Sequence, residues 1–131
     1  WNAEIVSYWT DKLVQLGVKT ISLSDTVGSS KPDDISYIFN SLIPKYPHVE
    51  FGAHLHTTLD KWHEKVDAAW KSGCKRFDGA IKGYGGCPMA KDDLTGNMPT
   101  EKIADYFFKL EKIDIDKDCL ALSIDKADFV F

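Results

Sequence analysis

His54 and His56 are separated by a single residue, and this spacing allows both side chains to bind one metal ion. They lie at the end of a short apolar run, residues 49–55, that predicts a β-strand. Side chains alternate between the two faces of a strand, so both imidazoles are expected on one face with their Cα atoms roughly 7 Å apart. Two rings at that separation can bind one ion, and the sequence therefore predicts a pair of metal ligands.

A glycine-rich stretch further along the chain carries a thiol that could act beside the histidines. Gly83, Gly85 and Gly86 precede Cys87 and Pro88. Glycine reaches backbone conformations with positive φ, so this segment is predicted to be a loop that can close over a substrate. A free thiol has a pKa of ~8.5, which leaves it protonated near neutral pH but easily ionised. Cys87 is therefore a candidate catalytic acid.

Composition excludes several classes of protein. A chain of 131 residues is long enough for one domain with a core. The formal net charge of −4 leaves no basic surface, so we expect no nucleic-acid partner. No apolar run approaches the ~20 residues of a membrane span, so we expect no membrane partner. An odd number of cysteines argues against a disulfide framework and for a reducing compartment. The chain opens in a helical pattern, and residues 1–131 are expected to be a single partial domain cut from a longer chain.

Apolar spacing divides the chain into alternating helices and strands. Helices are predicted at about residues 3–16, 31–43, 59–71 and 99–112, with a further short helix in 113–131. Strands are predicted at 19–24, 49–55 and 75–81. Trp9, Trp62 and Phe107 have the spacing of core residues. Strands that alternate with helices predict βαβ crossovers and a parallel sheet. Three strands cannot close a (β/α)₈ barrel, so the chain forms either a small open sheet or the last part of a barrel.

The candidate residues share one edge of this predicted sheet. Asp25 follows the first strand, the histidines end the second, and the Cys87 loop follows the third. Parallel α/β folds build their sites at the carboxyl ends of the strands. Asp25 therefore joins the candidate site.

Three sequence blocks, in this order, resemble the C-terminal half of the 3-hydroxy-3-methylglutaryl-CoA (HMG-CoA) lyase family, within the DRE-TIM metallolyase superfamily. They are ISLSDTVG at 21–28, HLH at 54–56, and GYGGCP at 83–88 followed by TGN at 95–97. The resemblance implies an α/β fold in which parallel βα units form about strands six to eight of a TIM (β/α)₈ barrel. The Gly-Gly-Cys-Pro block is what separates the lyases from the related Claisen-type synthases.

The resemblance also implies a site. It assigns a divalent metal, Mg²⁺ or Mn²⁺ with Zn²⁺ as an alternative, to His54, His56 and the side-chain carbonyl of Asn97. Cys87 becomes the catalytic thiol on a mobile loop, and Asp25 helps to position the substrate. The family's fourth ligand is an Asp beside a catalytic Arg at the end of strand one, and this sequence has no such motif. The chain alone is therefore expected to be inactive.

The implied reaction is cleavage of an HMG-CoA-like hydroxyacyl-CoA to acetyl-CoA and a keto acid, as in leucine degradation. The enzyme would be an oxo-acid lyase, cytoplasmic in a bacterium or in the mitochondrial matrix of a eukaryote. Open sheet edges predict a homo-oligomer. Two other functions stay open: a Claisen-type synthase or aldolase of the same superfamily, and a non-catalytic metal-binding or assembly module.

Each candidate residue also has a purely structural interpretation. The histidines could be structural or exposed, and Cys87 could be a small buried apolar residue. Asp25 could cap the loop that follows it, and Asn97 could be the N-cap of the helix after Pro99.

Overall fold

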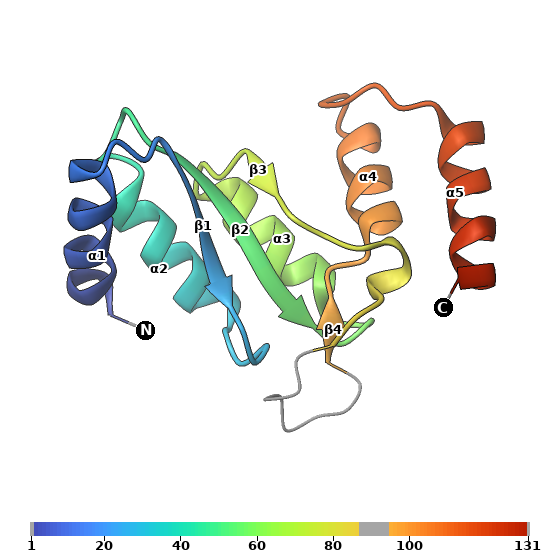
Figure 1. Cartoon of the computed structure of the whole chain (residues 1–131), viewed down its shortest axis with the longest axis horizontal. Helices are drawn as coiled ribbons and strands as arrows, with labels where there is room; N and C mark the ends of the chain where they lie inside the picture. The colour runs from blue at the N-terminus through green and yellow to red at the C-terminus, as the bar shows by residue number, and fades with distance from the viewer. Residues whose placement is uncertain (1, 87–94, 131) are drawn as a thin grey trace.

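A computed structural model of the chain describes residues 2–86 and 95–130. Its α/β architecture has parallel strands β1, β2 and β3 in that spatial order, with β4 antiparallel to the end of β2 (Figure 1). The predicted α/β fold with parallel strands is confirmed. The elements are α1 Ala3–Gln15, β1 Thr20–Asp25, α2 Pro32–Leu42, β2 Glu50–Thr57, α3 Trp62–Lys71, β3 Arg76–Phe77, the 3₁₀ turn η1 Ile81–Gly83, β4 Gly96–Asn97, α4 Thr100–Lys109 and α5 Lys117–Val130.

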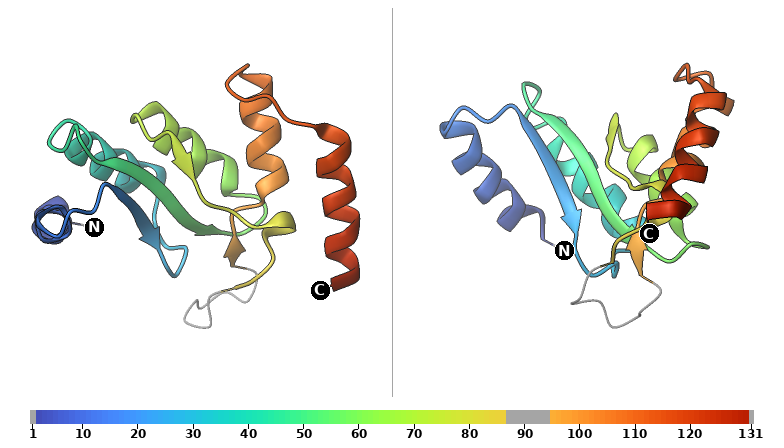
Figure 2. Two further views of the ribbon diagram at one scale, coloured as in Figure 1. Left: turned by 45° about the horizontal axis from the view of Figure 1, so that its top comes forward. Right: turned by 45° about the vertical axis from the view of Figure 1, so that its right-hand side comes forward.

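The hydrophobic core lies between the sheet and helices α2 and α3, which cover one face of it (Figure 2). Period-two alternation in β2 directs its apolar side chains to this core, and helical spacing in α2 and α3 supplies the facing surface. The central members are Phe51, Ala53 and Leu55 from β2, Ile35, Ile38, Phe39 and Leu42 from α2, and Val66 and Ala69 from α3.

The third predicted strand is shorter than expected. Only Arg76 and Phe77 pair with β2, at Gly52 and Ala53. Beyond them the backbone of Ala80 bonds to the segment before α4, accepting from Thr100 N and donating to Met98 O. The chain therefore leaves the sheet after Phe77, the third residue of the predicted strand. The same segment forms β4, which the sequence did not predict.

Two of the three predicted core residues pack in or against the core, and the third is exposed. Phe107 is buried and Trp62 packs at the edge of the core, as predicted. Trp9 is 60% exposed, so its prediction as a core residue is wrong. Helix α1 turns another face inward, where Thr10 is buried and Tyr46 Oη donates to Ser7 O. No helix within the described residues is long and apolar enough to cross a membrane.

Candidate functional site

Strand β2 brings the two imidazoles together on the face opposite the core. Their ring centroids are 5.4 Å apart, with the ring planes at 75°. His56 is buried, and the His54 side chain is 43% exposed. Alternation along the strand explains the shared face, because the residues between and beside them, Ala53 and Leu55, point into the core.

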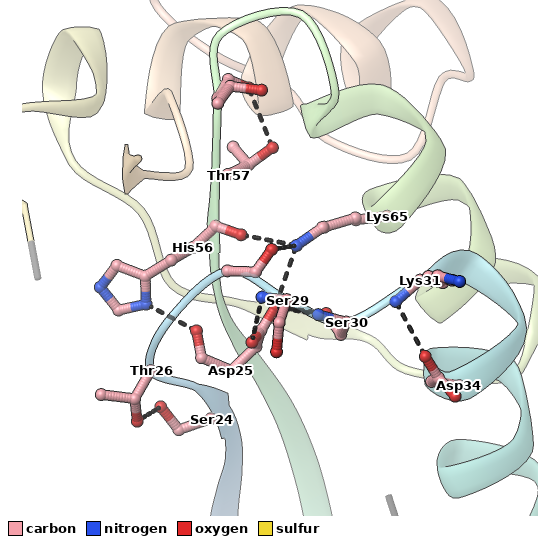
Figure 3. A network of polar contacts seen from close by, with 12 residues as sticks. Ser24, Asp25, Thr26, Ser29, Ser30, Lys31, Asp34, His56, Thr57 and Lys65 are labelled. Atoms are coloured by element: carbon pink, nitrogen blue, oxygen red, sulfur yellow. Dashed lines mark hydrogen bonds and ion pairs between the residues drawn. The ribbon is translucent and has the colours of Figure 1, made fainter. Parts of the chain in front are cut away.

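The His56 ring is oriented by the backbone of Asp25. Its Nδ1 lies 3.0 Å from the Asp25 carbonyl oxygen (Figure 3). A carbonyl can only accept a hydrogen bond, so Nδ1 carries the proton in the neutral ring and Nε2 keeps its lone pair. This pattern, in which a backbone carbonyl holds one ring nitrogen and frees the other, is typical of metal-binding histidines.

The His54 ring lies beside a carboxylate, at a longer distance than the contact that orients His56. Its Nδ1 lies 3.5 Å from Asp78 Oδ2, and the same oxygen accepts a 2.9 Å hydrogen bond from Ser22 Oγ. Arg76 Nε approaches the other carboxylate oxygen at 3.7 Å. The carboxylate favours the proton on Nδ1, so both rings present Nε2 on the open side of the sheet.

Asn97 is next to His56 because β4 pairs antiparallel with the end of β2 at these two residues. Its Nδ2 donates to Tyr84 O at 2.8 Å and to Gly85 O at 3.4 Å. The amide nitrogen is thus used by the loop, and Oδ1 is the atom that a cation could use. The N-cap of α4 is Pro99, so Asn97 does not cap that helix.

The glycines of the loop permit this close contact with Asn97. Gly83 and Gly85 have φ of +68° and +83°, conformations that glycine adopts readily. A Cβ on Gly83 would lie 2.8 Å from Asn97 O, and one on Gly85 would lie 3.0 Å from Asn97 Nδ2. Gly86 forms a bridge with Gly96. The next residue, Cys87, lies outside the described residues.

The carboxylate of Asp25 lies on the other side of the sheet from the imidazoles. Asp25 pairs in register with Leu55 and follows Ile21 and Leu23 at period two, so it faces α3. There it accepts from Ser29 N and Ser30 N, each at 3.0 Å, and from Ser30 Oγ. It thus caps the following loop, and the structure does not place it in a pocket with His54 and His56. The backbone carbonyl of Asp25, on the other hand, contacts the His56 ring.

A buried lysine pairs with this carboxylate. Lys65 Nζ lies 2.9 Å from Asp25 Oδ2, and both side chains are under 5% exposed. Burial alone would raise the pKa of Asp25, but hydrogen bonds from Ser30 and Lys65 and the Lys65 charge outweigh it, so the pKa lies below its usual value. Sequence reasoning missed Lys65, although its position on the inward stripe of α3, between Trp62 and Ala69, signals burial. It also missed Asp78, which no local pattern distinguishes.

The other cysteines do not offer a catalytic thiol at this edge. Cys74 is buried, and its Sγ lies 3.1 Å from the Arg76 carbonyl. Burial raises the pKa of the Cys74 thiol to about 11, so it stays protonated. Cys119 is exposed on α5. Both fit the structural interpretation.

The donor set fits a divalent cation by type and orientation. Two imidazole nitrogens and one amide oxygen form a mixed N/O set of the kind that Mg²⁺, Mn²⁺ and Zn²⁺ accept. Within residues 2–86 and 95–130, no group of three or more His, Cys, Asp or Glu side chains is placed to hold a metal ion.

Comparison with known proteins shows the family to which the chain belongs. The HMGL-like family model matches residues 2–123. The chain is 33% identical over 106 residues to (R)-citramalyl-CoA lyase of Chloroflexus aurantiacus, covering 81% of this chain and 33% of that protein. It is 31% identical to hydroxymethylglutaryl-CoA lyase YngG of Bacillus subtilis, covering 81% and 34%. The chain thus spans about a third of the length of these curated relatives.

Solved structures give the same result for the fold. An HMG-CoA lyase from Acinetobacter baumannii, in complex with coenzyme A and 3-methylmalate, superposes with a TM-score of 0.75 at 30% identity, covering 88% of this chain and 38% of that one. The HMG-CoA lyase of Bacillus subtilis superposes with the same TM-score at 29% identity, covering 87% and 38%. The α/β fold with parallel strands therefore matches TIM-barrel lyase structures, and the assignment to strands six to eight stays a prediction.

Proposed function

Since this chain belongs to the HMGL-like family, we propose that it carries part of the active site of a metal-dependent lyase that cleaves a carbon–carbon bond in a hydroxyacyl-CoA. The observation that carries this proposal is the matched orientation of two histidines. His54 and His56 each have Nδ1 near an oxygen atom, at 3.5 Å and 3.0 Å, and His56 is paired with Asn97. The names of the relatives, which are lyases of CoA thioesters, favour this function over a synthase or an aldolase.

The residues that would hold the cation follow from the donor atoms. His54 and His56 would bind through Nε2 and Asn97 through Oδ1, with Mg²⁺ or Mn²⁺ expected and Zn²⁺ as the alternative. When bound, such an ion would supply Lewis-acid polarisation of a substrate hydroxyl, which lowers the pKa of that hydroxyl. The Asp25 and Asp78 contacts keep both rings in the tautomer that can bind.

The proposed substrate is HMG-CoA or a close hydroxyacyl-CoA analogue. Loss of the hydroxyl proton forms a ketone as the carbon–carbon bond breaks, and the electron pair of that bond leaves as the enolate of the acyl-CoA. The thiol of Cys87 would then protonate the enolate carbon. Gly83 and Gly85 support this role because their backbone brings the loop against Asn97, and Gly85 is two residues before Cys87 in the sequence. The products are acetyl-CoA and a keto acid.

Metal analysis of purified variants tests the site. Wild-type protein, His54→Ala, His56→Ala and Asn97→Ala are dialysed against Mn²⁺, and the bound metal is measured by mass spectrometry. His48→Ala is the matched control, because His48 is exposed in a turn away from the sheet edge. We expect metal loss in the three site variants only. Equal metal content in His54→Ala and wild type would remove the ligand assignment.

The role of Cys87 needs a turnover measurement. The chain alone is expected to be inactive, because its sequence lacks the Arg-Asp motif that the resemblance requires. Cleavage of HMG-CoA is therefore compared for wild type and Cys87→Ala in an enzyme that also supplies that motif. A large loss of turnover with retained metal supports the acid role, and undiminished turnover would exclude it.

A homo-oligomer is the second element of this proposal. Helix α1 exposes an apolar stripe formed by Ile5, Trp9 and Leu16, with exposed fractions of 59%, 60% and 80%. It lies beside β1, whose second edge has no partner strand in the described residues. Such a surface favours assembly with a second copy. Light scattering of the purified chain tests this: a dimer or larger species is expected, and a stable monomer would contradict it.

A further inference from the structure

A buried ammonium group lies directly behind the His56 imidazole. Lys65 Nζ donates to three oxygens, which are Asp25 Oδ2 at 2.9 Å, Gly28 O at 2.9 Å and His56 O at 2.8 Å (Figure 3). Lysine is almost never fully buried unless it is paired, and an ammonium group has three protons to donate. All three donors of Lys65 are therefore used, and they join β1, the following loop and β2.

These contacts form a closed hydrogen-bond network around His56. The Lys65 ammonium group holds the Asp25 carboxylate, and the carbonyl of the same Asp25 accepts from His56 Nδ1. The carbonyl of His56 in turn accepts from Lys65. The two backbone segments that orient the imidazole are thus tied to one cation. Ser30 is part of the same hydrogen-bond network, since its N–H and hydroxyl also donate to the Asp25 carboxylate.

We propose that Lys65 is a positioning residue for the metal-binding imidazole of His56, acting through the carboxylate and carbonyl of Asp25. The proposal rests on the proposed role of His56 as a metal ligand. Without the ammonium group, the Asp25 carboxylate and the His56 carbonyl lose a shared partner in a dry environment. The Asp25 carbonyl is then no longer held at 3.0 Å from Nδ1, and the ring can take the tautomer with the proton on Nε2, which has no lone pair on Nε2 for a cation.

The alternative is a purely structural ion pair. Such a pair would affect stability and leave the tautomer of a folded variant unchanged. A role in orienting a metal ligand predicts a different result, because loss of a residue that hydrogen-bonds a metal ligand typically lowers metal affinity by about 10- to 100-fold. The tautomer of His56 therefore separates the two interpretations, and it can be measured without any metal.

The experiment compares Lys65→Met with Lys71→Met in the whole chain. Lys71 is on the same helix and pairs with Asp67, but its side chain is 73% exposed. Long-range ¹H–¹⁵N spectra of the metal-free proteins, recorded at one pH for all variants, report the tautomer of each ring. Mn²⁺ affinity is measured separately by electron paramagnetic resonance.

In wild type and Lys71→Met we expect His56 protonated on Nδ1. In Lys65→Met we expect a mixture of tautomers at His56, an unchanged His54, and an affinity for Mn²⁺ about 10- to 100-fold lower. Wild-type tautomer and affinity in folded Lys65→Met would overturn the proposal. If that variant does not fold, Lys65→Gln takes its place, because the shorter glutamine side chain cannot donate to all three oxygens that Lys65 contacts. An unchanged tautomer and unchanged Mn²⁺ affinity in Lys65→Gln would overturn the proposal equally. Failure of wild type to bind Mn²⁺ would refute the proposed function instead, since the tautomer test does not use metal.

Discussion

Nδ1 of His54 lies 3.5 Å from Oδ2 of Asp78, so the residue that follows β3 places a carboxylate beside an imidazole that β2 presents. The Asp78 backbone is held to β2 as well, because its N–H donates to Ala53 O at 3.0 Å. Its carboxylate is anchored by Ser22 from β1. All three parallel strands thus contribute to the orientation of one ring.

Replacement of Asp78 should therefore weaken metal binding without removing a ligand. We expect Asp78→Ala to lower Mn²⁺ affinity about 10- to 100-fold, and Asp78→Asn, which keeps an oxygen acceptor, to lower it less. Calorimetric titration measures both. Asp105→Ala is the control, since that carboxylate is half exposed on α4 and pairs with Lys109 of the same helix. If Asp78→Ala binds Mn²⁺ as tightly as wild type, then His54 does not need the Asp78 carboxylate in order to bind metal.

The close approach of the glycine loop to Asn97 predicts a measurable cost of adding one methyl group. Gly17→Ala, at φ +85° with nothing within 4 Å of the new Cβ, should cost about 1–2 kcal/mol of unfolding free energy from backbone strain alone. Gly83→Ala adds a contact of 2.8 Å with Asn97 O, so we expect roughly 2–4 kcal/mol and weaker metal binding. Urea unfolding compares the two variants. Equal costs would mean that the loop yields without disturbing Asn97.

Tyr106 predicts a loss of stability at alkaline pH. Burial, with a 2.8 Å hydrogen bond to Asp67, raises its pKa from 10.0 to about 12. The folded state therefore holds the phenolic proton more tightly than the unfolded state. This stabilisation is complete below pH 10 and is lost as the pH rises toward 12.

Tyr106→Phe should remove this part of the pH dependence, and Tyr37→Phe, at an exposed position, should leave it unchanged. The comparison uses unfolding free energies measured between pH 9 and pH ~12, because the pKa of Tyr106 in the folded protein is about 12. Identical pH profiles for wild type and Tyr106→Phe would contradict the assignment.

The exposed position of Trp9 predicts that this large side chain contributes little to the fold of the single chain. Trp9→Ala should change the unfolding free energy by no more than about 0.5 kcal/mol at a dilution where the chain is monomeric. Phe39→Ala removes a side chain that is 2% exposed and should cost about 3–5 kcal/mol. Urea unfolding measures both variants. A comparable cost for Trp9→Ala would place that side chain in a buried contact.

Several features were predictable because they depend on neighbours in the sequence. Helical and strand periodicity located α1, β1, α2, β2, α3 and α4, and the alternation of these elements predicted the parallel sheet. Trp9 shows the limit of this reasoning. Helical spacing identifies an apolar stripe but does not show whether another element covers it, and α1 packs on α2 through a different face.

Asp25 shows the same limit at the site. Its position at the end of the first strand was enough to place it at the candidate site, but its period-two spacing from Ile21 and Leu23 turns the side chain toward the core. Its partner Lys65 is 40 residues away in the sequence, and no local pattern connects the two. Burial of the carboxylate became favourable only when α3 brought an ammonium group against it.

The sequence by itself determined that His54 and His56 share one face of a strand, because alternation is a local property of the extended backbone. It also determined that Gly83 and Gly85 could adopt positive φ. Only the tertiary structure decided which nitrogen each imidazole presents, since the acceptors come from β1 for one ring and β3 for the other. Ring orientation is set by hydrogen bonds to groups distant in the sequence, and such groups meet only when the sheet is assembled.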